Sequence, residues 1–192
     1  MYNIIALIGK AGAGKDTLLQ ELLSNHPESL NEIISCTTRP PRQGEINGKN
    51  YHFMTEDEFF SLQATNQLIE STKFNNWYYG TPISSLTEDK INVGVFNPAG
   101  IRSLASFEYV NLITIYVYVD DKTRLIRQLN REDYPNVPEI IRRYQADEID
   151  FQNIPLISNS SFLFVPNKSK EDLHSVAPSL IKNKAIEVFG QW

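Results

Sequence analysis

The chain reads Gly9-Lys10-Ala11-Gly12-Ala13-Gly14-Lys15-Asp16-Thr17 close to its start, and this stretch decides the fold. It follows the apolar, β-branched run Asn3–Ile8, which predicts a buried strand. It leads into Asp16–Ser24, where leucines recur at helical spacing. A G-x-x-x-x-G-K spacing between a strand and a helix is typical of a phosphate-binding loop, because glycines let backbone N–H groups face an anion at a helix N-terminus.

Two positions of this phosphate loop indicate nucleotide chemistry. Lys15 offers a point charge to the outer phosphates of ATP. Asp16 stands where the motif expects a hydroxyl that reaches magnesium, and a carboxylate there repels phosphate unless a cation bridges the two. The alternative is a glycine-rich turn in which Asp16 only favours the first helical turn. We predict an ATP site at Gly9, Ala11, Gly12, Ala13, Gly14, Lys15, Asp16 and Thr17, with Asp16 and Thr17 as candidate ligands of Mg²⁺.

Composition places the chain among ordinary globular proteins. Its 192 residues are 41% hydrophobic and 21% charged, with a formal net charge of −5, which argues against a broad basic face for nucleic acid. The single Cys36 excludes an internal disulfide framework, and the three histidines lack zinc-like spacing. No apolar run approaches the ~18 residues that span a bilayer, and no secretion signal is recognisable. We expect a cytoplasmic protein with no membrane or nucleic-acid partner.

Strand and helix patterns alternate along most of the chain. Further strands are predicted at Glu32–Cys36, Tyr51–Met54, Leu68–Phe74, Trp77–Thr81, Asn92–Phe96, Asn111–Val119 and Phe162–Val165. Further helices are predicted at Glu56–Gln63, Pro98–Ser106, Asp121–Arg131, Pro138–Asp150 and Glu171–Phe189. The alternation predicts an α/β fold with a mainly parallel sheet and helices on both faces. Residues 37–86 break the alternation and are expected to form an inserted lobe.

The inserted segment carries the most specific pattern, Thr37-Thr38-Arg39-Pro40-Pro41-Arg42-Gln43-Gly44-Glu45-Ile46-Asn47-Gly48-Lys49-Asn50-Tyr51-His52-Phe53-Met54. It resembles the guanylate kinase signature at every fixed position, and the resemblance extends over nearly the whole chain. The resemblance implies a three-layer P-loop kinase core at residues 1–36 and 87–192, with a helical lid at about 131–143. It implies a monophosphate-binding lobe at 37–86. It also implies transfer of the γ-phosphoryl group of ATP, with Mg²⁺, to GMP or dGMP.

The side chains of the lobe suit a guanosine monophosphate. Arg39 and Arg42 lie in a proline-rich loop, and their guanidinium groups can bind phosphate bidentately. A carboxylate at Glu70 suits the N1–H and amine of guanine, whereas adenine presents a lone pair at N1. By the resemblance, GMP is bound by Ser35, Arg39, Arg42, Glu45, Tyr51, Glu70, Tyr79 and Thr81. The plainer alternatives are a solvated basic turn, packed aromatic rings, strand hydroxyls and, for Glu45, a surface charge.

Arginines gather on the two helices expected at the lid. The resemblance assigns Arg131, Arg142 and Arg143, with Lys15, to neutralising the transferred phosphoryl group. It assigns Asn167 to the adenine of ATP, although a simple turn residue is an alternative. For Arg124 and Arg127 we expect a solvated helix face.

The sequence departs from the family pattern in one further place. Guanylate kinases usually carry two aspartates where this chain has Val95 and Asn97. We interpret this loss as coupled to the carboxylate gained at Asp16, which would take over contact with Mg²⁺. Two other functions stay open: a kinase for another (deoxy)nucleoside monophosphate or a sugar phosphate, or a non-catalytic guanylate kinase-like binding module. A monomer and a homodimer are equally compatible with the sequence.

Overall fold

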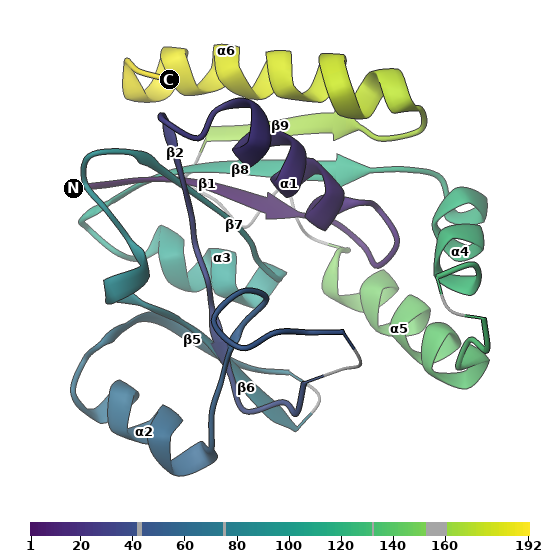
Figure 1. Cartoon of the computed structure of the whole chain (residues 1–192), viewed down its shortest axis with the longest axis horizontal. Helices are drawn as coiled ribbons and strands as arrows, with labels where there is room; N and C mark the ends of the chain where they lie inside the picture. Colours follow the sequence, from purple (N-terminus) through teal and green to yellow (C-terminus); the bar gives the residue numbers. More distant parts are fainter. Residues whose placement is uncertain (42–43, 75, 132, 153–160) are drawn as a thin grey trace.

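Two β-sheets carry the fold of this computed structural model, which describes residues 1–41, 44–74, 76–131, 133–152 and 161–192 (Figure 1). The larger sheet is parallel throughout, in the order β2 (Leu30–Glu32), β7 (Ile91–Val95), β1 (Tyr2–Ile8), β8 (Val110–Tyr118), β9 (Ser161–Pro166). The smaller sheet has the order β4 (His52–Phe53), β3 (Cys36–Thr37), β6 (Trp77–Pro82), β5 (Leu68–Phe74). The phosphate loop therefore begins at the carboxyl end of the central strand.

Helices cover both faces of the larger sheet, as predicted. Ile5 and Leu7 of β1 pack with α1 (Lys15–Asn25) and α6 (Ala177–Phe189). The alternate side chains of β1, including Ile4 and Ala6, pack with α3 (Pro98–Ala105) on the other face. Because both faces of β1 are buried, its sequence is a continuous apolar run. The α/β class is confirmed.

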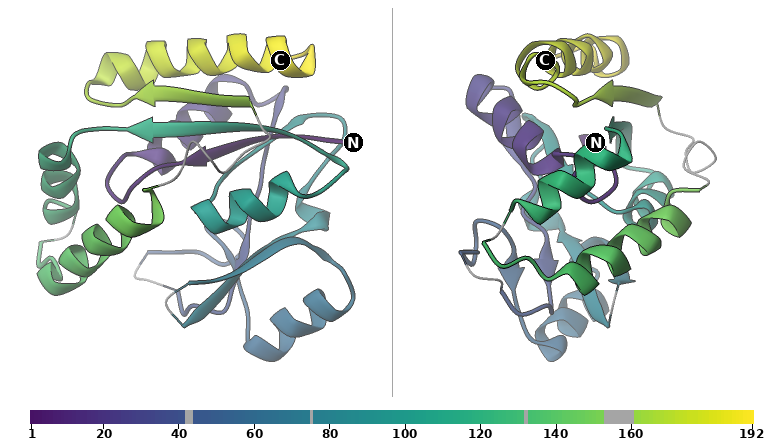
Figure 2. Two further views of the ribbon diagram at one scale, coloured as in Figure 1. Left: turned by 180° about the vertical axis from the view of Figure 1, so that it is seen from behind. Right: turned by 90° about the vertical axis from the view of Figure 1, so that its right-hand side faces the viewer.

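The remaining helices lie outside these layers. Figures 1 and 2 show α2 (Glu56–Ala64) beside the smaller sheet, and α4 (Asp121–Leu129) with α5 (Val137–Asp150) at one side of the molecule. Short helical turns occur at Ile83–Ser85 and Asp172–Val176. No helix in the described part of the chain has the length and apolarity needed to cross a lipid bilayer.

Two predicted elements differ from the structure. The strand expected at Glu32–Cys36 is wrong: β2 ends at Glu32 in the larger sheet, and β3 starts at Cys36 in the smaller one. The apolar pattern continues from β2 into β3, so it does not indicate where the chain leaves the larger sheet and enters the smaller one. The closing helix is divided into a π-helical turn at Asp172–Val176 and α6, because Pro178 cannot donate the backbone hydrogen bond that would continue one regular helix.

The buried amide of Asn92 joins β7 to β1 and β2 near the amino ends of these strands, at the end of the sheet away from the phosphate loop. Asn92 of β7 is fully buried, and its Oδ1 accepts hydrogen bonds from Asn31 Nδ2 at 2.8 Å and Thr87 N at 2.9 Å. Its Nδ2 donates to Asn3 O at 3.2 Å and to Thr87 O at 2.8 Å. One side chain thus satisfies polar groups of β1, β2 and the loop before β7.

We expect Asn92→Ala to lower the free energy of unfolding by about 2 to 4 kcal/mol, because it leaves several buried polar groups without partners. Urea denaturation at neutral pH measures the change. The control is Asn111→Ala, which removes an exposed amide that bonds Asn3 Oδ1 at 3.0 Å and should cost less than about 0.5 kcal/mol. Equal losses in the two variants would contradict the role of Asn92.

Candidate active site

A cleft of about 260 Å³ lies between the phosphate loop, the smaller sheet, the region after β7, and α5. The structure brings together in its wall many residues that the sequence predicts for the site: Gly9, Ala11, Lys15, Ser35, Tyr51, Glu70, Tyr79, Arg142 and Arg143. Segments far apart in the sequence therefore meet at the carboxyl ends of the parallel strands, where α/β proteins usually bind ligands.

The phosphate loop is held in a conformation that glycine adopts readily. Gly12 has φ +80°, and a Cβ atom there would lie 2.4 Å from Arg124 O. Gly14 has φ +88°, and its Cβ would lie 2.2 Å from Asn167 Nδ2. A side chain at either position would combine backbone strain with a steric clash. The loop is thus packed closely against the start of α4 and the residue after β9.

The lysine of the loop folds back toward the loop backbone. Lys15 Nζ donates to Gly9 O at 2.7 Å, and burial lowers the pKa of Lys15 against the attraction of Asp16 and Asp147. Asp16 and Thr17 are exposed on the first turn of α1. Their carboxylate and hydroxyl oxygens are the donor type that Mg²⁺ prefers. No group of three metal-ligating side chains is assembled within the ranges that the structure covers.

Asn167 supports the phosphate loop instead of acting as a simple turn residue. It is 5% exposed, and its Nδ2 donates to Ala13 O at 2.7 Å. Its backbone oxygen accepts a hydrogen bond from Arg127 NH2 at 2.8 Å. The side chain therefore ties the end of β9 to the loop, and its contact with adenine stays a prediction.

Arg39 is held by a carboxylate in the inserted lobe. The arginine is 4% exposed, and its NH1 and NH2 donate to Glu45 Oε2 and Oε1, both at 2.9 Å. The Arg39 guanidinium carbon lies 5.5 Å from the centre of the Tyr51 ring, which is 6.1 Å from the Tyr79 ring. Burial raises the pKa of Tyr51 to about 12, so its hydroxyl stays protonated and able to donate. Arg42 lies outside the described residues.

Glu70 presents a buried carboxyl group to the cleft. The residue is 6% exposed, and Thr81 Oγ1 donates to Glu70 Oε1 at 2.8 Å. Burial raises the pKa of Glu70 to about 7, while the Thr81 hydrogen bond acts in the opposite direction. Ser35 lines the same cleft. The site thus contains a buried acid whose charged form would be favoured by further hydrogen-bond donors.

Two of the three predicted catalytic arginines reach the cleft from α5. Arg142 Nε and NH2 donate to Glu139 at 2.7 and 2.8 Å, and Arg143 Nε donates to Glu139 Oε1 at 2.7 Å. These bonds lower the pKa of Glu139 to about 2. Arg131 is exposed after α4 and is not among the cleft-lining residues of the described chain. The structure therefore does not bring Arg131 together with the other two.

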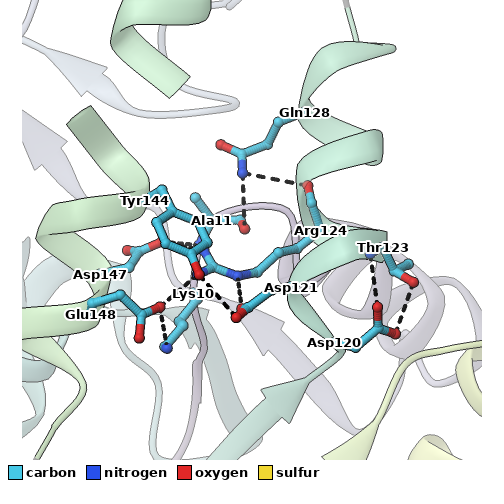
Figure 3. Close-up of polar contacts among 10 residues, drawn as sticks. All are labelled: Lys10, Ala11, Asp120, Asp121, Thr123, Arg124, Gln128, Tyr144, Asp147 and Glu148. Atoms are coloured by element: carbon cyan, nitrogen blue, oxygen red, sulfur yellow. Dashed lines mark hydrogen bonds and ion pairs between the residues drawn. The ribbon is translucent and has the colours of Figure 1, made fainter. Parts of the chain in front are cut away.

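The expectation of a solvated face at Arg124 and Arg127 is wrong. Arg124 is 1% exposed and donates to Asp121 at 2.7 Å and to Glu148 at 2.7 Å, with Asp147 at 3.3 Å (Figure 3). Arg127 is partly buried and bonds the backbone after β9. Helical spacing alone does not reveal that acidic residues of α5 pack against this face of α4.

Two residues that line the cleft, Asp147 and Asn97, are not among the site residues predicted from the sequence. Asp147 Oδ2 accepts a hydrogen bond from the phosphate-loop amide of Ala11 at 2.7 Å, and burial raises the pKa of Asp147. The sequence signal that could have identified Asp147 was the acidic pair Asp147–Glu148, which faces the basic side of α4. Asn97 caps α3 by accepting from Gly100 N at 2.7 Å, and its Nδ2 donates to Thr72 Oγ1 at 3.3 Å.

Comparison with known proteins gives a consistent match. Residues 1–174 match the family model described as guanylate kinase. The guanylate kinase of Nostoc sp. is 34% identical over 162 residues, covering 78% of this chain and 80% of the relative. That of Campylobacter jejuni (strain RM1221) is 26% identical over 189 residues, covering 96% and 91%. The crystal structure of guanylate kinase from Anaplasma phagocytophilum shares the fold, with TM-score 0.65 at 19% identity over 95% of this chain and 86% of that chain.

The raised pKa of Glu70 predicts a pH-dependent stability. Between its ordinary pKa of 4.5 and its shifted pKa of about 7, the folded state holds a proton that the unfolded state has released. This one group therefore makes the free energy of unfolding fall as the pH rises through that window, by up to about 1.4 kcal/mol per pH unit. Urea denaturation of wild type and Glu70→Gln at a series of pH values should show this fall only in wild type. Parallel curves would contradict the buried acid.

Proposed function

The chain belongs to the guanylate kinase family, and we propose how its residues perform the family's reaction, transfer of the γ-phosphoryl group of ATP to GMP. One observation supports the proposal most: the buried carboxyl group of Glu70 and the phosphate-loop Lys15 line the same cleft. The cleft therefore contains a group that can hydrogen-bond to guanine. It also contains a group that can contact the outer phosphates of ATP.

On the acceptor side, we assign the base to Glu70, with Thr81 and Ser35 beside it. Guanine brings two N–H donors to the carboxylate, which favours its charged form and offsets the effect of burial on the Glu70 pKa. A base that lacks these donors would leave the buried acid without its partners. The acceptor can be GMP or dGMP, since these groups contact only the base.

The acceptor phosphate is assigned to Arg39 and Arg42, with Tyr51 and Tyr79 as hydroxyl donors. Glu45 fixes the plane of the Arg39 guanidinium through two parallel hydrogen bonds, so that the arginine is orientated before the nucleotide arrives. The acceptor phosphate is already an anion, so no general base is required for attack.

On the donor side, the phosphate loop holds the triphosphate and Lys15 contacts its outer phosphates. We assign the adenine to Asn167, whose side chain is hydrogen-bonded to Ala13 O of the loop. Asp16 and Thr17 would hold Mg²⁺ beside the loop. Bound there, Mg²⁺ would supply positive charge that neutralises the negative charge developing on the phosphates during transfer.

The lid contributes positive charge. Arg142 and Arg143 now bind Glu139, and we propose that they exchange this carboxylate for the transferred phosphoryl group. Arg131 would join them when the lid closes. We propose that the lid, at about 131–143, and the lobe, at 37–86, close over the core. Closure would exclude water and direct the phosphoryl group to GMP.

We expect wild type to consume ATP with GMP or dGMP as acceptor, and to discriminate against AMP by about 10⁴-fold in kcat/KM. A coupled assay over a panel of nucleoside monophosphates and sugar phosphates measures this. Glu70→Gln should lose most of the discrimination, while Glu108→Gln, in an exposed turn, should retain it. Activity with another acceptor alone, or nucleotide binding without turnover, would favour the two alternative functions and overturn this one.

For Asp16→Asn we expect a lower kcat and a several-fold higher Mg²⁺ concentration at half-maximal rate, because one anionic oxygen ligand becomes a neutral amide. Titration of Mg²⁺ at fixed ATP and GMP gives both values. Glu28→Gln, an exposed acid just beyond the other end of α1, controls for the lost charge. An unchanged titration and unchanged turnover would remove Asp16 from the metal site.

A further inference from the structure

The lid helix α5 reaches back to the phosphate loop through two acidic side chains. Asp147 Oδ2 accepts a hydrogen bond from the Ala11 amide at 2.7 Å, and Glu148 Oε1 pairs with Lys10 Nζ at 2.5 Å. Figure 3 shows both carboxylates directed from α5 toward the loop and the start of α4. The loop thus already contacts anions of its own chain at the place where an anionic ligand is expected.

Arg124 fixes these carboxylates from the side of α4. Its guanidinium donates to Glu148 Oε1 at 2.7 Å and to Asp147 Oδ2 at 3.3 Å, and it lies 4.0 Å from the centre of the Tyr144 ring (Figure 3). Arg124 is 1% exposed and the Asp147 side chain 16%, whereas the Glu148 side chain is 42% exposed, so the contact between Arg124 and Asp147 is the part of this junction most shielded from water. Loop, α4 and α5 are therefore joined by one charged cluster.

The carboxylate of Asp147 also acts on the lysine of the loop. Asp147 lines the same cleft as Lys15, and its negative charge favours the protonated form of that lysine. A nucleotide triphosphate brings several negative charges to these same groups. Because like charges this close repel strongly in a partly buried site, the carboxylate and the phosphates cannot both stay there at low cost.

We propose that Asp147 is an internal anion that holds α5 on the empty phosphate loop, and that the phosphates of ATP displace it. The inference rests on the proposed function, since ATP is the competing anion. Arg143 lies one helical turn before Asp147 on α5, so displacement of Asp147 moves the arginine-bearing part of the lid as ATP arrives. The apparent affinity for ATP is then the intrinsic affinity multiplied by the fraction of molecules in which Asp147 does not occupy the loop.

The test compares binding of Mg²⁺·ATP to wild type, Asp147→Ala and a charge control by isothermal titration calorimetry without acceptor. We expect Asp147→Ala to bind ATP about threefold to tenfold more tightly, because no carboxylate has to be displaced. The control is Asp89→Ala, which removes the same charge from an exposed turn at the opposite edge of the sheet and should bind like wild type.

Kinetics separate this role from a purely structural one. In Asp147→Ala the KM for ATP should fall by a similar factor, whereas the KM for GMP should change by less than about twofold. In the ligand-free protein, the amide hydrogen of Ala11 should exchange faster in Asp147→Ala than in wild type, because its acceptor is gone. A merely destabilising substitution would not tighten ATP binding.

A folded Asp147→Ala that binds ATP as wild type does, or more weakly, overturns the inference. If that variant fails to fold, Asp147→Asn keeps the side-chain shape and an acceptor for Ala11 but removes the charge. Asp147→Asn should bind ATP at least about twofold more tightly than wild type. An affinity that does not increase would also overturn the inference. Wild type that phosphorylates GMP while neither variant gains affinity refutes only the role of Asp147. Wild type that does not bind ATP refutes the proposed function and this inference together.

Discussion

The close packing of the phosphate loop against its neighbours is the constraint on which the rest of the site depends. At Gly12 and Gly14 there is room only for hydrogen, because Arg124 O and Asn167 Nδ2 occupy the space of a side chain. These two contacts set the loop against the start of α4 and the end of β9. The loop, α4 and the last strand are thereby positioned together, before any ligand binds.

The second organising feature is that four arginines of the site elements are paired with carboxylates of the same chain. Arg39 is bound by Glu45, Arg142 and Arg143 by Glu139, and Arg124 by acids of α4 and α5. A net charge of −5 is therefore compatible with a site for anions. If ligand phosphates exchange with these carboxylates, as proposed above, binding is linked to rearrangement of the elements that carry the acids.

The sequence predicted the parts of this protein in which chemistry and local pattern coincide. The glycine-rich loop lies between a buried strand and a helix as predicted, and Glu70 lies on the strand predicted at Leu68–Phe74. Predictions failed where the answer depended on a partner distant in the chain. Helical spacing identified the face of α4 that holds Arg124 but not the acids of α5 that bury it. Asp147 accepts a hydrogen bond from the backbone amide of Ala11, which lies 136 residues earlier in the chain. No side-chain motif encodes such a contact.

The neutral side chain of Asn97 has a consequence for the buried acid Glu70. A methyl group at Gly100 would lie 3.4 Å from both Asn97 Oδ1 and Glu70 Oε2, so the two side chains are near neighbours. Asn97 caps α3 with its oxygen and keeps its amide for Thr72, without adding charge. An aspartate at this position could also cap the helix, but its charge would raise the pKa of Glu70 still further above about 7. The amide of Asn97 therefore caps α3 without adding a negative charge that would raise the pKa of Glu70 further.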